Sequence, residues 1–240
     1  MLEQAIIAVL ITLFNLSPGM SQAATVESTN NNEGNRSNYK LLYFNARWRG
    51  EGARLIFAYA GVPYEDVRVT KEEWPKLKPT TPFGHLPVLK FGGHELGESF
   101  AINRYLARQF GLAGNGSLEE AYVDSIADFF KDFFEKTGES VKAIITGGGP
   151  IDPAYNEIVA PARDAFLPPL ERFLKKANSG YVVGNSATWA DLIITEYLAT
   201  CQSAIPGFLS GYPSVESYVN RIRLLSNIKK WIDNRPQSDH

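Results

Sequence analysis

The stretch that decides the fold is residues 39–69, which read YKLLYFNARWRGEGARLIFAYAGVPYEDVRV. Its first six residues form an apolar run rich in aromatics, which predicts a strand, and residues 45–50 predict a loop. Residues 51–60 place apolar side chains on one helical surface, and Gly61 follows where a left-handed C-terminal cap is needed. Because residues 64–69 predict a second strand, the whole stretch predicts a β-α-β unit.

The same domain is predicted to continue beyond this unit. After an irregular, proline-rich segment, residues 86–91 read LPVLKF, which predicts a strand. Gly92-Gly93 can take positive φ, as a tight hairpin turn requires, so residues 94–96 are expected to pair back. A helix is predicted at residues 100–110. The α/β domain is therefore expected to occupy residues 38–114.

Beyond residue 114 the pattern predicts helices only. The Gly-rich segment 111–117 marks a boundary between two domains. Thr188-Trp189-Ala190-Asp191 matches a capping box at a helix start. The predicted fold class is α/β followed by an all-α domain over residues 115–240. Apolar residues at helical spacing predict helices at residues 118–136, 154–177, 190–200 and 215–233.

The first 24 residues have the layout of a secretory signal peptide. Residues 5–14 read AIIAVLITLF, and small residues follow up to position 24. The run is shorter than the about 20 apolar residues that span a bilayer. A membrane anchor or a buried helix is the alternative, because the leading MLEQ lacks basic residues. We expect a secreted, extracellular protein with no stable membrane association once residues 1–24 are removed.

The segment after the predicted signal, residues 25–37, is polar and Asn-rich and predicts a flexible spacer. The sequons that begin at Asn35 and Asn115 predict glycosylation of both side chains. Cys201 is the only cysteine, so no disulfide can form within the chain. We expect Cys201 to be a buried structural thiol.

Composition limits the classes of partner. The chain has 24 Lys and Arg against 26 Asp and Glu, interspersed rather than blocked, for a net charge of -2. This distribution gives no field of one sign that would gather phosphates, so no nucleic-acid partner is predicted. No metal site is predicted either.

Five motifs in one order resemble the glutathione S-transferase family. They are residues 38–45 (NYKLLYFN), 83–89 (FGHLPVL), 98–107 (ESFAINRYLA), 112–115 (LAGN) and 184–191 (GNSATWAD). Each is weak alone, whereas all five in the family's order are specific. Within the family the chain is most similar to the sigma class, which includes the haematopoietic-type prostaglandin D synthases. The resemblance implies a thioredoxin-like N-terminal domain, an all-helical C-terminal domain, and glutathione as the cosubstrate.

The resemblance places the catalytic tyrosine at Tyr43, at the end of the first strand. A phenol with a pKa of about 10 keeps its proton at neutral pH and can donate a hydrogen bond to a sulfur that loses its own. That bond favours the thiolate, which is the nucleophile. The resemblance also implies that Arg49 supplies positive charge near the sulfur, while Arg47 and Arg54 stay open as alternatives.

The resemblance further implies a cradle around glutathione. A cis peptide at Leu86-Pro87 would present the Leu86 backbone to the cysteinyl unit as an added strand. Ser99, at a helix start, would face the γ-glutamyl carboxylate. Trp74 and Lys78 would hold the glycine carboxylate. The implied glutathione-binding residues are Tyr43, Arg49, Trp74, Lys78, His85, Leu86, Pro87, Glu98, Ser99 and, from the partner subunit of a homodimer, Asp132.

Two of these residues depart from the class pattern. Glu98 stands where glutamine is common, and His85 where lysine is frequent, so the affinity for glutathione can shift either way. A second-substrate pocket is expected between the two domains, lined in part by Phe44, Arg47 and residues near the loop at 147–150.

The expected activity is addition of glutathione thiolate to hydrophobic electrophiles. From the class resemblance alone, we also expect glutathione-dependent isomerisation of prostaglandin H to prostaglandin D. The alternative is a non-catalytic binding or structural protein of the same fold, as lens crystallins related to this class are. A thiol-disulfide oxidoreductase is disfavoured, because it needs a reactive cysteine near the first helix and the only cysteine is Cys201.

Overall fold

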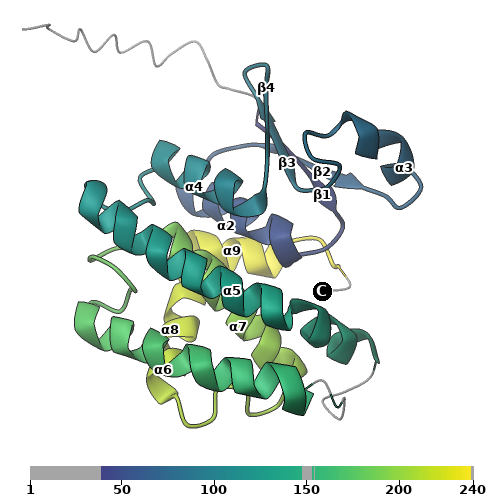
Figure 1. The fold of residues 1–240 in the computed structure, drawn as a ribbon. Helices are drawn as coiled ribbons and strands as arrows, with labels where there is room; N and C mark the ends of the chain where they lie inside the picture. Colours follow the sequence, from purple (N-terminus) through teal and green to yellow (C-terminus); the bar gives the residue numbers. More distant parts are fainter. Residues whose placement is uncertain (1–38, 148–152, 154, 239–240) are drawn as a thin grey trace, which may run out of the picture. The chain divides into compact units, whose positions relative to one another are not determined.

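The computed structural model describes residues 39–147, 153 and 155–238. The predicted signal at 1–24, the spacer at 25–37 with Asn35, and the loop at 148–150 lie outside the described residues. Ser37–His240 forms one compact unit. Within it the predicted order is confirmed, with strands and helices first and helices alone afterwards (Figure 1).

Among the described residues, the N-terminal half of the unit is a four-stranded sheet with strand order β2-β1-β3-β4. Strand β1 runs parallel to β2 and antiparallel to β3, and Leu42 lies opposite Val67 and Val88. The elements are β1 (Lys40–Phe44), α2 (Trp48–Ala60), β2 (Glu65–Val69), α3 (Trp74–Leu77), η1 (Lys78–Thr80), β3 (Val88–Phe91), β4 (His94–Gly97) and α4 (Ser99–Gln109).

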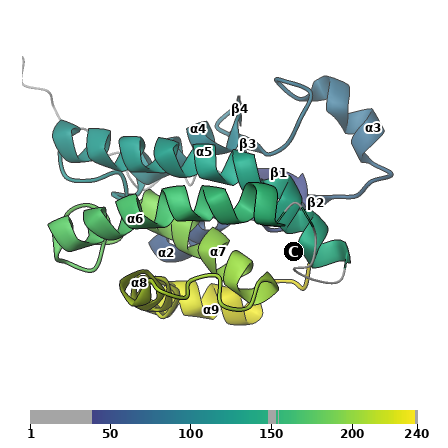
Figure 2. The same ribbon diagram turned by 60° about the horizontal axis from the view of Figure 1, so that its bottom comes forward.

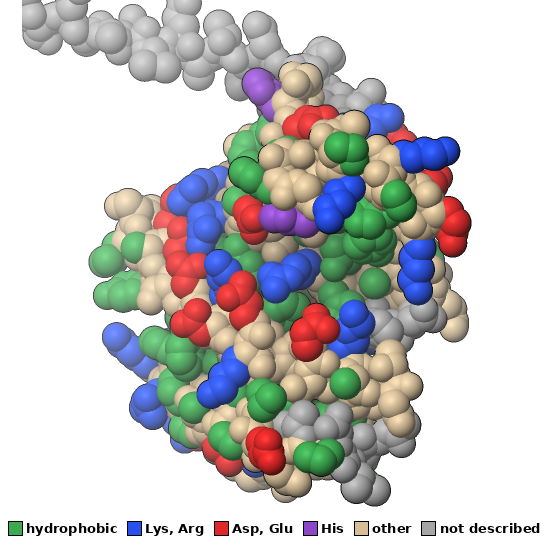
Figure 3. Space-filling model, turned by 45° about the vertical axis from the view of Figure 1, so that its right-hand side comes forward, with side chains coloured by type: hydrophobic (Ala, Val, Ile, Leu, Met, Phe, Trp, Pro, Cys, Tyr) green, Lys and Arg blue, Asp and Glu red, His purple; other side chains and the backbone are tan. Residues whose placement is uncertain are grey.

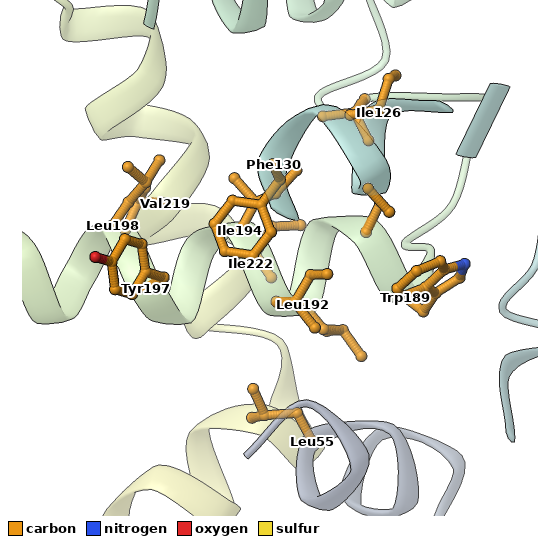
Figure 4. Packing of buried hydrophobic residues seen from close by; sticks show 14 of the residues in the cluster. Leu55, Ile126, Phe130, Trp189, Leu192, Ile194, Tyr197, Leu198, Val219 and Ile222 are labelled. Atoms are coloured by element: carbon orange, nitrogen blue, oxygen red, sulfur yellow. The ribbon is translucent and has the colours of Figure 1, made fainter. Parts of the chain in front are cut away.

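The C-terminal half is helical and is centred on the buried helix α7. Its elements are α5 (Ser117–Gly147), η2 (Tyr155–Val159), α6 (Ala160–Ala177), α7 (Trp189–Ala204), α8 (Pro213–Arg223) and α9 (Ser226–Asn234). Helix α7 packs against α2, α5 and α8. Figure 4 shows Leu55 of α2 pointing toward α7, so the two halves share one core. Cys201 in α7 is fully buried, as predicted, and burial raises its pKa far above the ordinary value.

The predicted capping box at the start of α7 is confirmed. The Asp191 carboxylate accepts hydrogen bonds from the backbone N–H and the hydroxyl of Thr188, each at 2.8 Å. It also accepts from the backbone N–H of Val182 at 2.9 Å and from the Tyr218 hydroxyl at 3.0 Å. Burial raises the pKa of Asp191, and these four donors act against that shift by stabilising the charged form.

Helix α2 begins at Trp48 rather than at residue 51. The predicted loop at 45–50 is shorter because the Arg47 carbonyl accepts hydrogen bonds from the N–H groups of Gly50 and Glu51, at 3.1 and 2.9 Å. Arg49 therefore lies in the first turn of α2, not in a loop before the helix. This places its backbone N–H at the end of β1.

Two further boundaries differ from the prediction. Helix α5 runs to Gly147 instead of ending near residue 136, since Val141 and Ile144 remain buried against the core. The single helix predicted at 215–233 is interrupted at residues 224–225 and forms α8 and α9. In Figures 1 and 2 the segment that follows α9 passes near the connection from β1 to α2, and Asn45 Nδ2 donates to the Gln237 carbonyl at 3.4 Å.

The surface of the unit mixes charges of both signs. On the face shown in Figure 3, basic and acidic side chains alternate, without a block of one sign. Asn115 is exposed in the connection between α4 and α5. Among the described residues, no helix is long and apolar enough to cross a membrane.

Candidate active site

Tyr43 is the candidate catalytic residue and lies in β1 beside a cavity. Its side chain is 7% exposed, and the backbone N–H of Arg49 hydrogen bonds to its phenol oxygen. Burial raises the pKa of Tyr43 above its ordinary value, although that N–H and the charges of Arg49 and Arg54 oppose the rise. The phenol therefore keeps its proton at neutral pH and can act as a hydrogen-bond donor.

The ring of Tyr43 lies directly against the backbone of Gly50. A methyl group added at Gly50 would lie 2.6 Å from Cγ and 3.0 Å from Cβ of Tyr43. Only a residue without a side chain allows this approach, so Gly50 sets the position of the phenol. Sequence reasoning missed this role, because a glycine in the first turn of a helix carries no signal of what lies against it.

Arg54 supports Tyr43 from behind. Its side chain has no exposed surface, and its guanidinium carbon lies 5.8 Å from the Tyr43 ring centre. The guanidinium donates to two carbonyl and two carboxylate oxygens, of Phe44 at 3.3 Å, Ala46 at 2.6 Å, Glu51 at 3.3 Å and Asp66 at 3.0 Å. Arg54 is one of the alternatives for the sulfur site. Its buried hydrogen bonds connect the end of β1 to α2 and β2.

Glu51 connects Arg54 to the C-terminal segment of the chain. It is 2% exposed and accepts hydrogen bonds from Trp231 Nε1 at 2.7 Å and from Arg235 at 2.8 Å. Both donors lie more than 170 residues further along the sequence, at and just after α9. The start of α2 is therefore held in place by the C-terminal segment.

Arg47, the other alternative, is engaged with Glu196 of α7. Its guanidinium lies 3.4 Å from Glu196, which also accepts from Arg223 at 2.6 Å and from Arg235 at 2.7 Å. Burial lowers the pKa of Arg47 and the Glu196 charge raises it. Arg47 lines an inner cavity of about 50 Å³ next to α7 and is absent from the lining of the cavity beside Tyr43.

Arg49 is the arginine that shares a cavity with Tyr43. Its side chain is 41% exposed, lies 3.8 Å from Glu135 and stacks over the Phe134 ring, 5.2 Å from the ring centre. The sequence left three arginines open, and the geometry favours Arg49, because it combines proximity to Tyr43 with access to solvent.

The cavity beside Tyr43 has a volume of about 150 Å³ and opens between β1, the start of α2 and α5. Phe44, predicted for the second-substrate pocket, is outside its lining and packs edge-on against Trp74 at 5.6 Å between ring centres. The assignments of Phe44 and Arg47 to that pocket stay predictions. The lining residues are Tyr43, Trp48, Arg49, Phe134, Glu135, Gly138, Glu139 and Lys142.

Several of the predicted glutathione-binding residues lie around the same sheet edge. The Leu86-Pro87 peptide is cis, as predicted. Leu86 belongs to a small buried apolar cluster with Tyr43, and Trp74 packs against this cluster. Lys78 is exposed at the start of η1, with its Cε 3.9 Å from the position that a Gly84 side chain would take. The fold therefore brings Tyr43, Leu86 and Trp74 together.

The start of α4 forms the other end of this region. Ser99 is the first residue of α4 and is 5% exposed, and Glu98 before it has a φ of 68°. The side chains of His85 and Glu98, the two departures from the class pattern, lie within hydrogen-bonding distance, with Nε2 2.8 Å from Oε1. The two departures therefore compensate each other locally. Asp132, predicted to act across a dimer, is exposed on α5.

The chain is similar in sequence and in structure to proteins of one family. Two family models match, "Glutathione S-transferase, N-terminal domain" over residues 38–108 and "Glutathione S-transferase, C-terminal domain" over residues 154–235. The chain is 52% identical over 204 residues to Glutathione S-transferase 1 of Ascaris suum, covering 84% of this chain and 98% of that protein. It is 45% identical over 205 residues to Glutathione S-transferase 4 of Caenorhabditis elegans, with the same coverage.

Among solved structures, the chain is similar to the crystal structure of the glutathione S-transferase from Ascaris lumbricoides. The TM-score is 0.81 at 52% identity, covering 85% of this chain and 100% of that one. A likeness at this level of identity and coverage confirms the predicted fold, a thioredoxin-like domain followed by a helical domain.

Proposed function

We propose that this chain, which belongs to the glutathione S-transferase family, uses the phenol of Tyr43 to hold the sulfur of bound glutathione as a thiolate. The observation that carries the proposal is the buried, protonated phenol of Tyr43, placed by Gly50 and the Arg49 N–H at the edge of a cavity. A hydrogen bond from the phenol favours thiolate over thiol, and each pKa unit that the thiol loses corresponds to about 1.36 kcal/mol.

In the proposed reaction, the thiol of glutathione loses its proton to solvent and the Tyr43 hydroxyl donates to the sulfur anion. The sulfur lone pair then forms a bond to an electrophilic carbon in the cavity, and the leaving group departs with its electron pair. Arg49 adds positive charge from the same cavity and favours the anion further. Tyr43 keeps its own proton throughout.

The other end of glutathione is assigned to the sheet edge and to α4. The hydroxyl and backbone N–H of Ser99, at the N-terminus of α4, suit the γ-glutamyl carboxylate because helix N-termini favour anions. The Leu86 backbone suits the cysteinyl unit. The indole N–H of Trp74 and the ammonium group of Lys78 suit the glycine carboxylate. The His85 and Glu98 pair would border the γ-glutamyl group.

A homodimer is part of the proposal. It is supported by exposed Asp132 on α5, which is free to reach a second copy. One similar structure, at 40% identity, is described as monomeric Na-GST-3 from Necator americanus, so the oligomeric state needs a direct measurement. Sedimentation equilibrium of the purified chain decides it, since a monomer at every concentration would remove the role proposed for Asp132.

The sigma class and prostaglandin isomerisation form a second candidate function. They are supported by similarity to the structure of rat hPGDS complexed with a quinoline, at 34% identity and a TM-score of 0.70. A Nu-class GST from Haemonchus contortus is more similar, at 42% identity and a TM-score of 0.76. The isomerase proposal fails if the protein with glutathione converts prostaglandin H to D no faster than glutathione alone.

Export and glycosylation remain proposals. They rest on the apolar segment at residues 5–14 and on the two sequons, of which Asn115 is exposed in the described fold. Expression of the full chain in a secretory cell line tests both, because a secreted product should lose mass on treatment with an N-glycosidase. Retention inside the cell would contradict the signal assignment.

The central test is Tyr43→Phe, which removes the phenol proton donor and leaves the ring. We expect kcat/KM for a chlorinated dinitrobenzene to fall about 10- to 100-fold, since a hydrogen bond to a charged group contributes about 1.5–3 kcal/mol. Tyr122→Phe, at an exposed position on α5, is the matched control and should change nothing. Wild-type protein without turnover above the uncatalysed rate would favour the non-catalytic alternative.

A further inference from the structure

Trp48, at the start of α2, has a strained backbone. Its φ is 27°, in the left-handed region that favours glycine. In the described part of the chain, only Trp48, Glu98 and Asn178 take positive φ without being glycine. Such a conformation is unfavourable by itself and persists where the surroundings impose it, often at functional sites. A tryptophan at this position therefore needs an explanation in what its side chain does.

The indole of Trp48 lies between the active-site cavity and the helical half. Its ring packs edge-on against Phe134 of α5, with centres 5.9 Å apart, and lies 6.1 Å from the ring of Tyr197 of α7. Trp48 lines both the cavity beside Tyr43 and the inner cavity next to α7. The indole thus forms part of the wall between the two cavities.

The same wall includes Arg49 and Phe134, which also line both cavities. The Arg49 guanidinium stacks on Phe134, so the wall is a layer of flat groups that continues from Trp48. A flat wall of this kind offers stacking surface to a planar ligand that enters beside Tyr43.

The inner cavity is small, and polar side chains form part of its otherwise apolar lining. It holds about 50 Å³ and is lined in part by Asn103, Glu196 and Thr200. Asn103 is 3% exposed, and its Oδ1 has no hydrogen-bond partner among the described residues. Because Trp48 lines both cavities, removal of its indole would join the inner cavity to the one beside Tyr43.

We propose that Trp48 determines which electrophiles this enzyme accepts, and restricts them to compact, planar, electron-poor aromatic rings. The inference rests on the proposed function of Tyr43. The outer cavity of about 150 Å³ is smaller than the about 300–1,000 Å³ of sites for drug-sized ligands. The electron-rich face of the indole stacks well with an electron-poor ring, and its bulk prevents longer substrates from reaching the inner cavity.

The test is Trp48→Gly, which suits the positive φ and removes the wall. Two substrates are compared, a chlorinated dinitrobenzene and a derivative with a bulky phenyl substituent away from the reacting carbon. We expect the ratio of kcat/KM for the bulky over the compact substrate to rise about tenfold or more, the size of effect that a change in pocket volume gives. Trp48→Phe keeps a flat ring and should leave the ratio near the wild-type value.

Asn178→Gly is the matched control, because Asn178 also takes positive φ, at the C-terminal cap of α6 and outside both cavities. It should leave the ratio unchanged. If Trp48→Gly does not fold, Trp48→Leu replaces it and should raise the ratio by a smaller factor. A ratio unchanged in a folded Trp48→Gly or Trp48→Leu variant overturns the proposal.

Binding separates this inference from the proposed function. The affinities of the two glutathione conjugates, measured by calorimetry, should show the same change in ratio without turnover. A chain that binds both conjugates in this way but conjugates nothing would contradict the role of Tyr43 and support that of Trp48. Equal affinity ratios in wild type and Trp48→Gly would contradict the role of Trp48.

Discussion

The two ends of the candidate active site are built in opposite ways. At the sulfur end, Tyr43 is 7% exposed and is fixed by the buried Arg54 and the backbone of Gly50. At the carboxylate end, where the γ-glutamyl group of glutathione is proposed to bind, His85 and Glu98 are 51% and 59% exposed and pair with each other. In the proposed site, the chemistry therefore depends on the core of the fold, whereas recognition of the peptide depends in part on side chains that solvent screens.

The sulfur end also draws on distant sequence. Glu51, in the first turn of α2, is held by Arg54 from its own helix and by Trp231 and Arg235 from the end of the chain. Buried charges of this kind are costly when one partner is lost, because the other stays buried without compensation. Substitutions at the two ends should therefore differ in kind, with losses of stability or geometry at the sulfur end and small changes in affinity at the other.

The largest effect is expected from Arg54→Met, which keeps the apolar stem and removes the charge. It would leave Glu51 and Asp66 without their partner and two carbonyls without a donor. We expect the free energy of unfolding to fall by about 3–5 kcal/mol, measured by urea denaturation. Lys40→Met, which breaks an exposed ion pair with Glu65, is the control and should cost about 0.5 kcal/mol or less. An equal loss of unfolding free energy in Arg54→Met and Lys40→Met would mean that the buried charges around Tyr43 stabilise the fold no more than an exposed ion pair does.

Gly50→Ala tests the position of the phenol without removing it. The added methyl group displaces the Tyr43 ring, and a displacement of about 1 Å can cost about 100-fold in rate. We expect kcat to fall about 100-fold with little change in KM for glutathione. The ultraviolet absorbance of bound thiolate should titrate at higher pH than in wild type, a change that a purely structural role would not cause.

Gly147→Ala is the control for Gly50→Ala. Among the described residues outside its own helical turn, a methyl group at Gly147 meets no atom within 4 Å, so it should leave kcat and the thiolate titration as in wild type. A Gly50→Ala variant with normal kcat would show that the sulfur end tolerates movement of the phenol, and the contrast between the two ends would be lost.

The fold followed from local patterns in the sequence. The strand at Tyr39 to Phe44, the Gly61 cap and the Thr188 capping box depend on neighbouring residues, and each is present in the structure. The start of α2 was predicted too late, because the turn residues at 45–50 indicate a loop in the sequence. In the structure, the Arg47 carbonyl accepts two hydrogen bonds that start the helix within this segment. Helix propensity alone could not anticipate that these local hydrogen bonds begin the helix at Trp48.

The site was predictable only where the family resemblance supplied a role. Tyr43, Leu86 and Trp74 were named from the motifs, and the fold brings them together. Gly50 was not named, since its importance arises from the Tyr43 ring that lies against it. The tie between Glu51 and Arg235 joins residues 184 positions apart, and no local pattern in a single sequence records such a contact.

A smaller effect is expected at the carboxylate end, from Glu98→Gln and His85→Ala, singly and together. An exposed contact between a histidine and a carboxylate is worth no more than an exposed ion pair, up to about 1 kcal/mol, so each variant should change KM for glutathione by less than about fivefold. The double variant should show the coupling of the pair, and added salt should reduce it. Glu95→Gln, in the Lys90 pair of the β3 and β4 hairpin, is the control and should leave KM unchanged. A loss above tenfold would show that this end is as tightly constrained as the sulfur end.

The smallest signal concerns the proton of Tyr43 itself. Because burial raises the pKa of Tyr43 above the ordinary value, its phenol should lose its proton only at a pH above that of a free tyrosine, about 10. The ultraviolet difference spectrum of wild type minus Tyr43→Phe should therefore show no tyrosinate band between pH 7 and pH 9. A band in that range would mean that Arg49 and Arg54 outweigh burial, and that Tyr43 meets the thiol as a base instead of meeting the thiolate as a donor. The sulfur end would then still be fixed by the core, but the negative charge would lie on the phenol before glutathione binds instead of on the sulfur.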